Sequence, residues 1–172
     1  PPSGTITTGA GNGSNVNSGD GGPATSAGMV IPIRCAVDQN SNLFIVDQGA
    51  HRIRKVDTGG TITTYGGNGS QGFSGDGGPA AQAAMNNPTA ASVDASGNLY
   101  VSDQNNQRIR KIDTGGIIQT VAGNGNATYS GDGGPATSAR PTIPGGNVAE
   151  PAREMLIVGA VNLAGASHRA GP

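Results

Sequence analysis

The sequence predicts an all-β protein assembled from repeated units, and two observations lead to this prediction. The phrase SGDGGPA occurs three times, at residues 18–24, 74–80 and 130–136, so that successive copies lie 56 residues apart. The chain also has 31 glycines but only 3% aromatic and 12% charged residues. Many glycines and small polar residues between short apolar runs are typical of β-structure with tight turns.

The repeat extends well beyond this phrase. The stretch GTITTGAGNG at residues 4–13 returns as GTITTYGGNG at residues 60–69 and as GIIQTVAGNG at residues 116–125. Residues 31–60 likewise match residues 87–116. We therefore treat residues 1–172 as a single segment with units at approximately residues 4–59, 60–115 and 116–172.

Each unit contains four segments with the character of β-strands. In the first unit these are CAVD at residues 35–38, LFIVD at 43–47, HRIRKVD at 51–57 and TITTY at 61–65. The connecting turns contain asparagine and glycine, which supply the positive φ values that hairpins between twisted strands require. Four antiparallel strands per repeat, without a helical period, predict the blades of a β-propeller.

The same residues resemble the NHL repeat, which is named after asparagine, histidine and leucine. The resemblance is carried best by Asn98, Leu99 and Tyr100 and by residues 48–55. His51 occupies the histidine position of the first unit, where the second unit has Gln107.

This resemblance covers roughly residues 1–158 and implies a propeller of four-stranded blades, often six in number. The insertion SGDGGPATSA is common in secreted bacterial members of the family, so the resemblance implies an extracellular or cell-surface location. The first residues show no signal peptide and no initiator methionine, and we read them as a mature or trimmed end.

The third unit departs from the pattern. Its register holds through Pro144 and residues 156–158, but the basic strand expected next is absent, and we read His168 and Arg169 as its displaced remnant. The sequence thus predicts an opening fourth strand, two full blades and a decayed or truncated third blade. Three blades cannot close a ring, so we expect a homo-oligomer, a head-to-tail filament or a fragment of a longer protein.

The repeated SGDGGPA phrase could bind a cation or form a corner. Asp20, Asp76 and Asp132 are weak calcium candidates, because each loop offers one carboxylate whereas calcium takes six to eight oxygens. We favour a turn that the aspartate caps, and predict neither a resident metal nor a cofactor. The single Cys35 is expected to be a small buried apolar residue.

The basic strands form a candidate interaction face, made of His51, Arg52, Arg54, Gln107, Arg108 and Arg110. Such arginines commonly pair with neighbouring acids, and the candidates here are Asp47, Asp57, Asp103 and Asp113. The net charge is −1 and aromatic partners are scarce, so nucleic acid is not an expected partner. No apolar run is long enough for membrane insertion.

Three asparagines lie in Asn-x-Ser/Thr sequons within polar, glycine-rich loops: Asn12, Asn68 and Asn126. On a secreted chain these are candidate glycan acceptors, although asparagine and glycine are also ordinary turn residues.

The leading functional hypothesis is a non-catalytic, extracellular and self-assembling protein, such as a scaffold, surface or fibre subunit. Catalysis is not expected because the only histidines are His51 and His168 and no nucleophile motif is present. Two alternatives stay open: a module that binds a protein or carbohydrate, and an enzyme resembling propeller lyases or lactonases with an axial metal.

Overall fold

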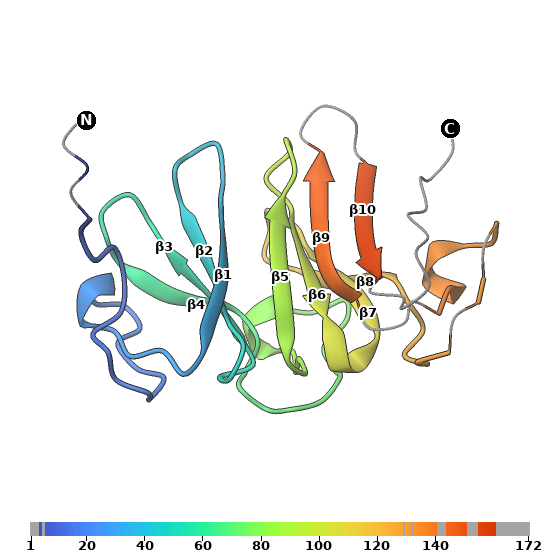
Figure 1. Ribbon diagram of the computed structural model, residues 1–172, viewed down its shortest axis with the longest axis horizontal. Coiled ribbons are helices and arrows are strands. Elements are labelled where there is room, and N and C mark those ends of the chain that lie inside the picture. The colour runs from blue at the N-terminus through green and yellow to red at the C-terminus, as the bar shows by residue number, and fades with distance from the viewer. Residues whose placement is uncertain are drawn as a thin grey trace.

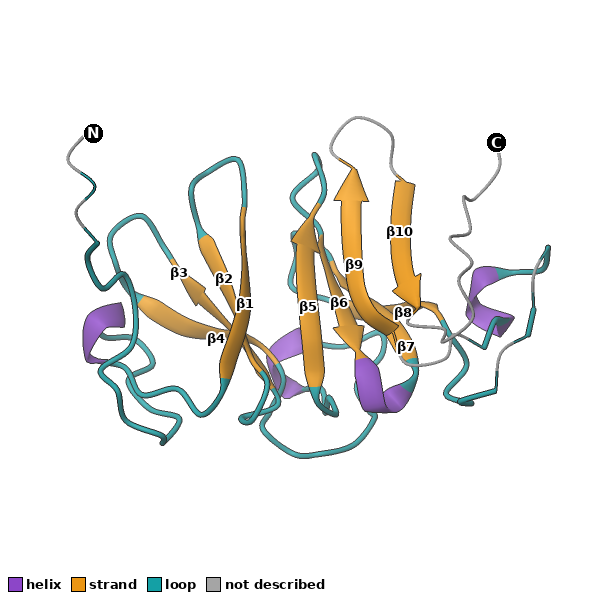
Figure 2. Ribbon diagram, in the orientation of Figure 1, coloured by secondary structure: helices purple, strands orange, loops and turns teal. Residues whose placement is uncertain are grey.

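A computed structural model describes residues 4, 6–128, 130–131, 133–140, 144–150 and 155–160. This part of the chain forms three antiparallel sheets that stand side by side (Figure 1). Two of them have four strands and one has two, and helical structure is confined to single 3₁₀ turns (Figure 2). The predicted all-β fold with blade-like sheets is confirmed.

The first sheet contains β1 (Pro32–Val37), β2 (Leu43–Asp47), β3 (Arg52–Val56) and β4 (Ile62–Gly66) in this order. The second sheet repeats it with β5 (Pro88–Val93), β6 (Leu99–Asp103), β7 (Arg108–Ile112) and β8 (Ile118–Ala122). Register is also repeated, since Phe44 lies opposite Lys55 and Tyr100 lies opposite Lys111. The four strands expected in a blade are therefore present twice.

The third sheet pairs β9 (Pro144–Glu150) with β10 (Met155–Ala160). These are the first two strands of a third blade, beginning at the proline that the sequence places in register. His168 and Arg169, which we read as a displaced remnant of the next strand, lie outside the described residues.

The opening fourth strand was predicted wrongly. Residues 6–8 are not in a strand, although the equivalent segment of the next unit forms β4. β4 is held by pairing with β3, whereas no third strand precedes residue 6 in the described chain. As a result, the side chain of Ile6 is 97% exposed while that of Ile62 is fully buried.

Single 3₁₀ turns close each repeated insertion: η1 (Ala24–Ser26), η2 (Ala80–Gln82) and η4 (Ala136–Ser138). A fourth turn, η3 (Gln104–Asn106), connects β6 to β7. None of the helices in the described residues is long and apolar enough to cross a membrane.

The main core lies between the first two blades. Phe44, Val46 and Ile53 of the first blade pack with the second blade and its insertion. The partners they meet are Ala80, Ala83, Met85, Leu99, Val101, Ile112 and Ile118. Burying each large aliphatic side chain contributes about 1.5–3 kcal/mol, so this contact between blades is a major source of stability.

Asp38 and Asp94 hold the hairpin turns that follow β1 and β5. Asp38 Oδ1 accepts the Asn40 and Asn42 N–H groups at 2.9 and 2.8 Å, and Asp94 does the same one repeat later. Partial burial of each carboxylate opposes its ionisation, but these hydrogen bonds outweigh burial and lower the pKa of both aspartates.

We therefore predict acid-sensitive stability that depends on these turns. A carboxylate with a lowered pKa stabilises the fold above pH of about 4, and that contribution is lost as the pH falls through the lower folded-state pKa. The variant carrying Asp38→Asn and Asp94→Asn should lose less Tm than the wild type between pH 5 and pH 3, measured by circular dichroism. Asp103 has a raised pKa, so it changes stability with pH in the opposite direction, but this effect is the same in the variant and the wild type. Parallel Tm profiles would contradict this account.

Candidate functional site

The SGDGGPA corner holds the buried arginine of the adjacent third strand. Arg54 on β3 is fully buried, and its Nη2 donates to Asp20 Oδ1 at 2.6 Å and to the Ser18 carbonyl at 3.1 Å. Thr64 on β4 donates its hydroxyl to the other oxygen of the same carboxylate at 2.7 Å. The aspartate thus ties the corner to two strands of the blade.

The second unit repeats this arrangement. Arg110 is fully buried, and its Nη2 donates to Asp76 Oδ1 at 2.7 Å and to the Ser74 carbonyl at 2.9 Å. Its Nη1 lies 3.5 Å from Asp103 Oδ2, so one predicted pairing with a strand-end acid is present. Because a buried guanidinium needs charged or polar partners, each corner supplies what its arginine requires.

The corner also covers the outer edge of each blade. The Gly21 N–H donates to the Ile62 carbonyl at 2.8 Å, and the Ile62 N–H donates to the Gly22 carbonyl at 3.0 Å. At Gly19, which has a φ of +85°, an added Cβ would lie 2.8 Å from the Cα of Ala27. Glycine is needed there for both reasons, which explains why the phrase recurs without change.

These contacts revise two predictions. Arg54 and Arg110 cannot belong to an exposed interaction face, because their side chains are buried and bonded within the chain. Asp20 and Asp76 do not simply cap their own turns; they bind arginine, and a cation there would compete with a guanidinium. Asp132, the third weak calcium candidate, lies outside the described residues.

The remaining residues of the predicted face are half-buried and make contacts within the chain. Arg52 donates to the Asn68 carbonyl at 2.7 Å, and Arg108 donates to the Asn124 carbonyl at 3.0 Å. His51 Nδ1 accepts the Asn87 N–H at 3.1 Å, so this histidine joins the first unit to the second. Gln107, its counterpart, is half-buried with a left-handed backbone at φ +53°.

The three sequon asparagines are exposed, as the glycine-rich loops predict. Asn12 Nδ2 donates to the Ser26 carbonyl at 2.9 Å, and Asn68 Nδ2 donates to the Gln82 carbonyl at 3.0 Å. Asn126 donates its backbone N–H to Asn124 Oδ1 at 3.0 Å. The side chains of Asn12 and Asn68 therefore also serve to fix their loops.

The strand-end acids are structural in this arrangement. Asp47 is fully buried and accepts the N–H groups of Val30 and Ile31 at 3.0 and 2.9 Å. Asp103 accepts the Asn86 N–H at 2.7 Å, and its burial raises its pKa despite this bond and the nearby Arg110. Within the part of the chain that the structure describes, no three His, Cys, Asp or Glu side chains gather as metal ligands would.

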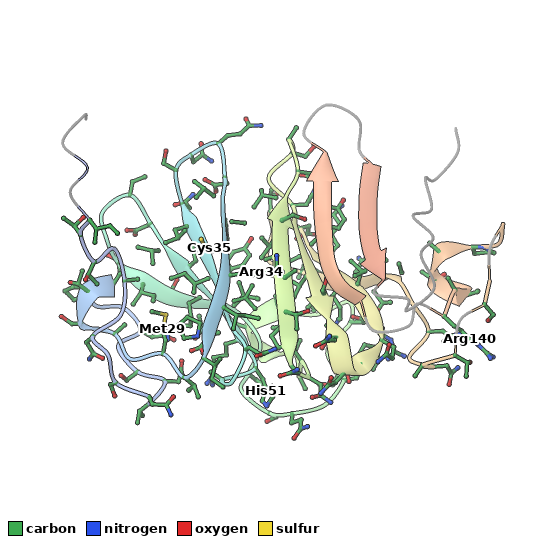
Figure 3. The ribbon with its side chains drawn as sticks, in the orientation of Figure 1. Met29, Arg34, Cys35, His51 and Arg140 are labelled. Atoms are coloured by element: carbon green, nitrogen blue, oxygen red, sulfur yellow. The ribbon has the colours of Figure 1, made fainter. Side chains whose placement is uncertain are left out.

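The open side of the first blade is the feature that sequence reasoning missed. β1 is exposed along most of its length, whereas β5, which lies beside both β1 and β9, is buried at its first three residues (Figure 1). Ile33 and Val37 on β1 are 40% and 60% exposed. Cys35 is also exposed on this strand, so the prediction that it is buried is wrong (Figure 3).

A hollow of about 800 Å³ lies beside this open side, between the N-terminal segment and the start of β1. Ala10, Gly11, Met29, Val30 and Pro32 are among the residues that line it. Met29 is half-buried there (Figure 3), whereas its counterpart Met85 is fully buried in the core between the two blades. In the next unit, Met85 packs with Ile53 of β3 and with other residues of the first blade.

The comparisons with known proteins agree with the repeat and the blades. The family model of the teneurin NHL domain matches residues 67–140. The predicted resemblance to NHL repeats is thus confirmed over this stretch. No curated protein matches the sequence.

Solved structures share the fold of these repeats. An auxiliary nutrient binding protein from Bacteroides thetaiotaomicron is 25% identical, with a TM-score of 0.61 over 73% of this chain and 34% of its own. A protein of unknown function from the same organism is 27% identical, with a TM-score of 0.55 over 63% of this chain and 27% of its own. The chain thus spans about a third or less of the length of these relatives.

We predict that removing Asp76 destabilises the fold because it leaves the buried Arg110 without its closest carboxylate. Hydrogen bonds to charged groups contribute about 1.5–3 kcal/mol, so Asp76→Ala should lower the free energy of unfolding in urea by that amount. The control Asp57→Ala removes an exposed carboxylate that accepts the Thr61 N–H at 2.8 Å, and should cost only about 0.5–1.5 kcal/mol. Equal losses would contradict the role given to the pair.

A calcium titration tests whether Asp20 and Asp76 bind a cation. Since Arg54 and Arg110 engage the carboxylates of Asp20 and Asp76, millimolar Ca²⁺ should leave the Tm of the protein unchanged. A rise in Tm that saturates with Ca²⁺, and that Asp20→Asn abolishes, would contradict this account.

Proposed function

We propose that the chain is a non-catalytic, self-assembling NHL propeller segment that works outside the cell as a scaffold, surface or fibre subunit. The observation that carries the proposal is the open side of the first blade. The corresponding side of the second blade is covered by the first, which buries Leu99, Val101 and Ile112 completely.

The open side keeps the apolar character of a surface between two blades. Ile45, Val56 and Ile62 pack there with Ala24 and Ala27 of the first insertion, forming a second and smaller core cluster. The second blade has an equivalent cluster, and the aromatic and aliphatic side chains of the first blade pack against it. Covering the open side with a further blade would bury additional apolar surface and so favour association.

The non-catalytic part of the proposal rests on how the ionisable groups are used. The buried acids accept backbone N–H groups or bind arginine, and His51 is bonded to the backbone of the next unit. These bonds occupy the groups that general acid–base chemistry would need to be free. The extracellular part rests on the family resemblance of the insertion and on three exposed sequons.

A binding module is the second candidate, favoured by one observation. The solved structure with a TM-score of 0.61 is described as an auxiliary nutrient binding protein. If this chain also bound a nutrient, a ligand would stabilise the folded state and raise its Tm by mass action.

We predict that the native particle is larger than the 16.8 kDa chain. Light scattering over a range of protein concentrations should give a discrete mass of two copies, which corresponds to a closed ring, or a series of larger particles, which corresponds to an open filament. The charged variant Val37→Lys should weaken association at least tenfold, because Val37 is exposed on β1.

The control for this variant is Thr114→Lys, which places the same charge at an exposed turn of the second blade. It should associate as the wild type does. A wild-type protein that stays monomeric at every concentration would contradict the proposed function.

A further inference from the structure

A short GNG loop recurs in every unit, at residues 11–13, 67–69 and 123–125. The second and third of these loops each hold an arginine from the third strand of the preceding unit. Arg52 Nη2 donates to the Asn68 carbonyl at 2.7 Å, and Arg108 Nη2 donates to the Asn124 carbonyl at 3.0 Å. These two loops are therefore binding sites for an arginine side chain.

The first GNG loop is organised in the same way but holds no arginine. Asn12 Nδ2 donates to the Ser26 carbonyl at 2.9 Å, and Asn12 Oδ1 accepts the Ser14 N–H at 2.8 Å. Asn68 makes the equivalent two bonds in the second loop. Among the described residues, no arginine donates to the Asn12 carbonyl. The acceptor is thus held in place by its own loop.

The space that the guanidinium fills in the second unit is open in the first. A Cβ added to Gly69 would lie 2.7 Å from both terminal nitrogens of Arg52, whereas a Cβ added to Gly13 would meet no atom within 4 Å. The first loop instead lines the hollow of about 800 Å³ beside the first blade. This space is large enough for an incoming side chain.

The segment that leads into the first loop also lacks a partner strand. Residues 4–8 and residues 60–64 have the identical sequence GTITT. The second copy leads into β4, which pairs with β3, whereas residues 6–8 are not in a strand and pair with no strand of the described chain. Because the local sequence is the same, the difference comes from the neighbouring strand.

We propose that residues 6–13 are a docking site for an arginine-bearing β-strand of a partner polypeptide. The strand has the pattern Arg-Ile-Arg-Lys that β3 and β7 share, and it pairs with residues 6–8 by strand addition. Its first arginine donates to the Asn12 carbonyl oxygen. This inference goes beyond the proposed function, because the site is complete in one copy of the chain and does not require self-association.

The chemistry of the site selects the arginine. The acceptor is a backbone carbonyl, whose partial negative charge complements a guanidinium. None of the residues that line the hollow is charged. Recognition therefore depends on hydrogen bonds from the fork of the guanidinium and not on an ion pair.

The same surroundings select an aliphatic residue next to the arginine. Met29 lines the hollow and is half-buried, whereas its counterpart Met85 is fully buried in one cluster with Ile53. Ile53 directly follows Arg52 on β3. An incoming strand that places an aliphatic side chain after its arginine would therefore cover Met29.

A peptide with the sequence of residues 51–57, HRIRKVD, tests the docking site, because its arginine fills the equivalent loop of the second unit. We expect saturable binding of one labelled peptide per chain, measured by fluorescence anisotropy in dilute protein. Arg52→Ala within the peptide should raise the Kd at least about tenfold, because it removes a charged hydrogen-bond donor. A scrambled peptide of the same composition and charge should bind no better than this alanine peptide.

A pair of protein variants locates the bound peptide. Gly13→Ala places a Cβ where the incoming guanidinium would lie, and should raise the Kd at least about tenfold. The control Gly21→Ala has a nearly identical φ, +80° against +82°, and equally open surroundings, so it carries the same backbone strain but should leave the Kd unchanged. Bound HRIRKVD should also slow amide exchange at residues 6–8. Circular dichroism confirms that both variants are folded.

The outcomes separate this inference from the proposed function. An absence of saturable binding to the folded wild type would overturn the docking site and leave self-association to its own test. Equal binding of the alanine or scrambled peptide, or equal binding by folded Gly13→Ala, would overturn the arginine contact. If HRIRKVD binds as expected and the protein stays monomeric at every concentration, the docking site stands and the proposed function is contradicted.

Discussion

The contact on which the rest of the structure depends is the buried guanidinium of each third strand, held by the aspartate of the repeated corner. Arg54 and Arg110 have no exposed surface, and their closest carboxylates come from the insertions that precede their own blades. Leaving a buried guanidinium without its carboxylate is costly, so this contact holds the insertion in place. In that position its glycines cover the outer edge of the fourth strand, and its alanines reach the core. In the second unit, Phe73 adds a stacking contact, 3.7 Å from the Arg108 guanidinium.

The first two insertions also differ in what packs against them on the side of the preceding blade. The first two insertions are anchored to the blades that follow them, and the GNG loops of the second and third units receive an arginine from the blade before. The second insertion has both neighbours in the described chain, and Met85 is fully buried there. The first insertion has only the blade that follows, so Met29 is half-buried and the strand β1 is exposed. Ile33 and Val37 of β1 are therefore exposed on the first blade.

The fold could be predicted from the sequence because the 56-residue period and the turn residues determine local structure. The sequence located the blade strands, the exposed sequons and the beginning of a third blade. The burial of Arg54 and Arg110 could not be predicted in this way, because alternation along a strand does not show that a distant corner supplies a carboxylate to the arginine. Only the fixed 34-residue offset from Asp20 and Asp76 carried that information. The burial of Cys35 and the opening strand at residues 6–10 were also predicted wrongly, because burial and strand pairing there depend on a neighbouring blade and not on the local sequence.

Hydrogen–deuterium exchange at low and high protein concentration tests most directly whether the first unit is an unfinished copy of the second. The account predicts rapid exchange of the amides of residues 6–8 in dilute protein and slow exchange once copies associate, while the equivalent amides in β4, paired with β3, stay protected throughout. Exchange at residues 6–8 that is slow in dilute monomer, or that stays rapid in the assembled particle, would contradict it.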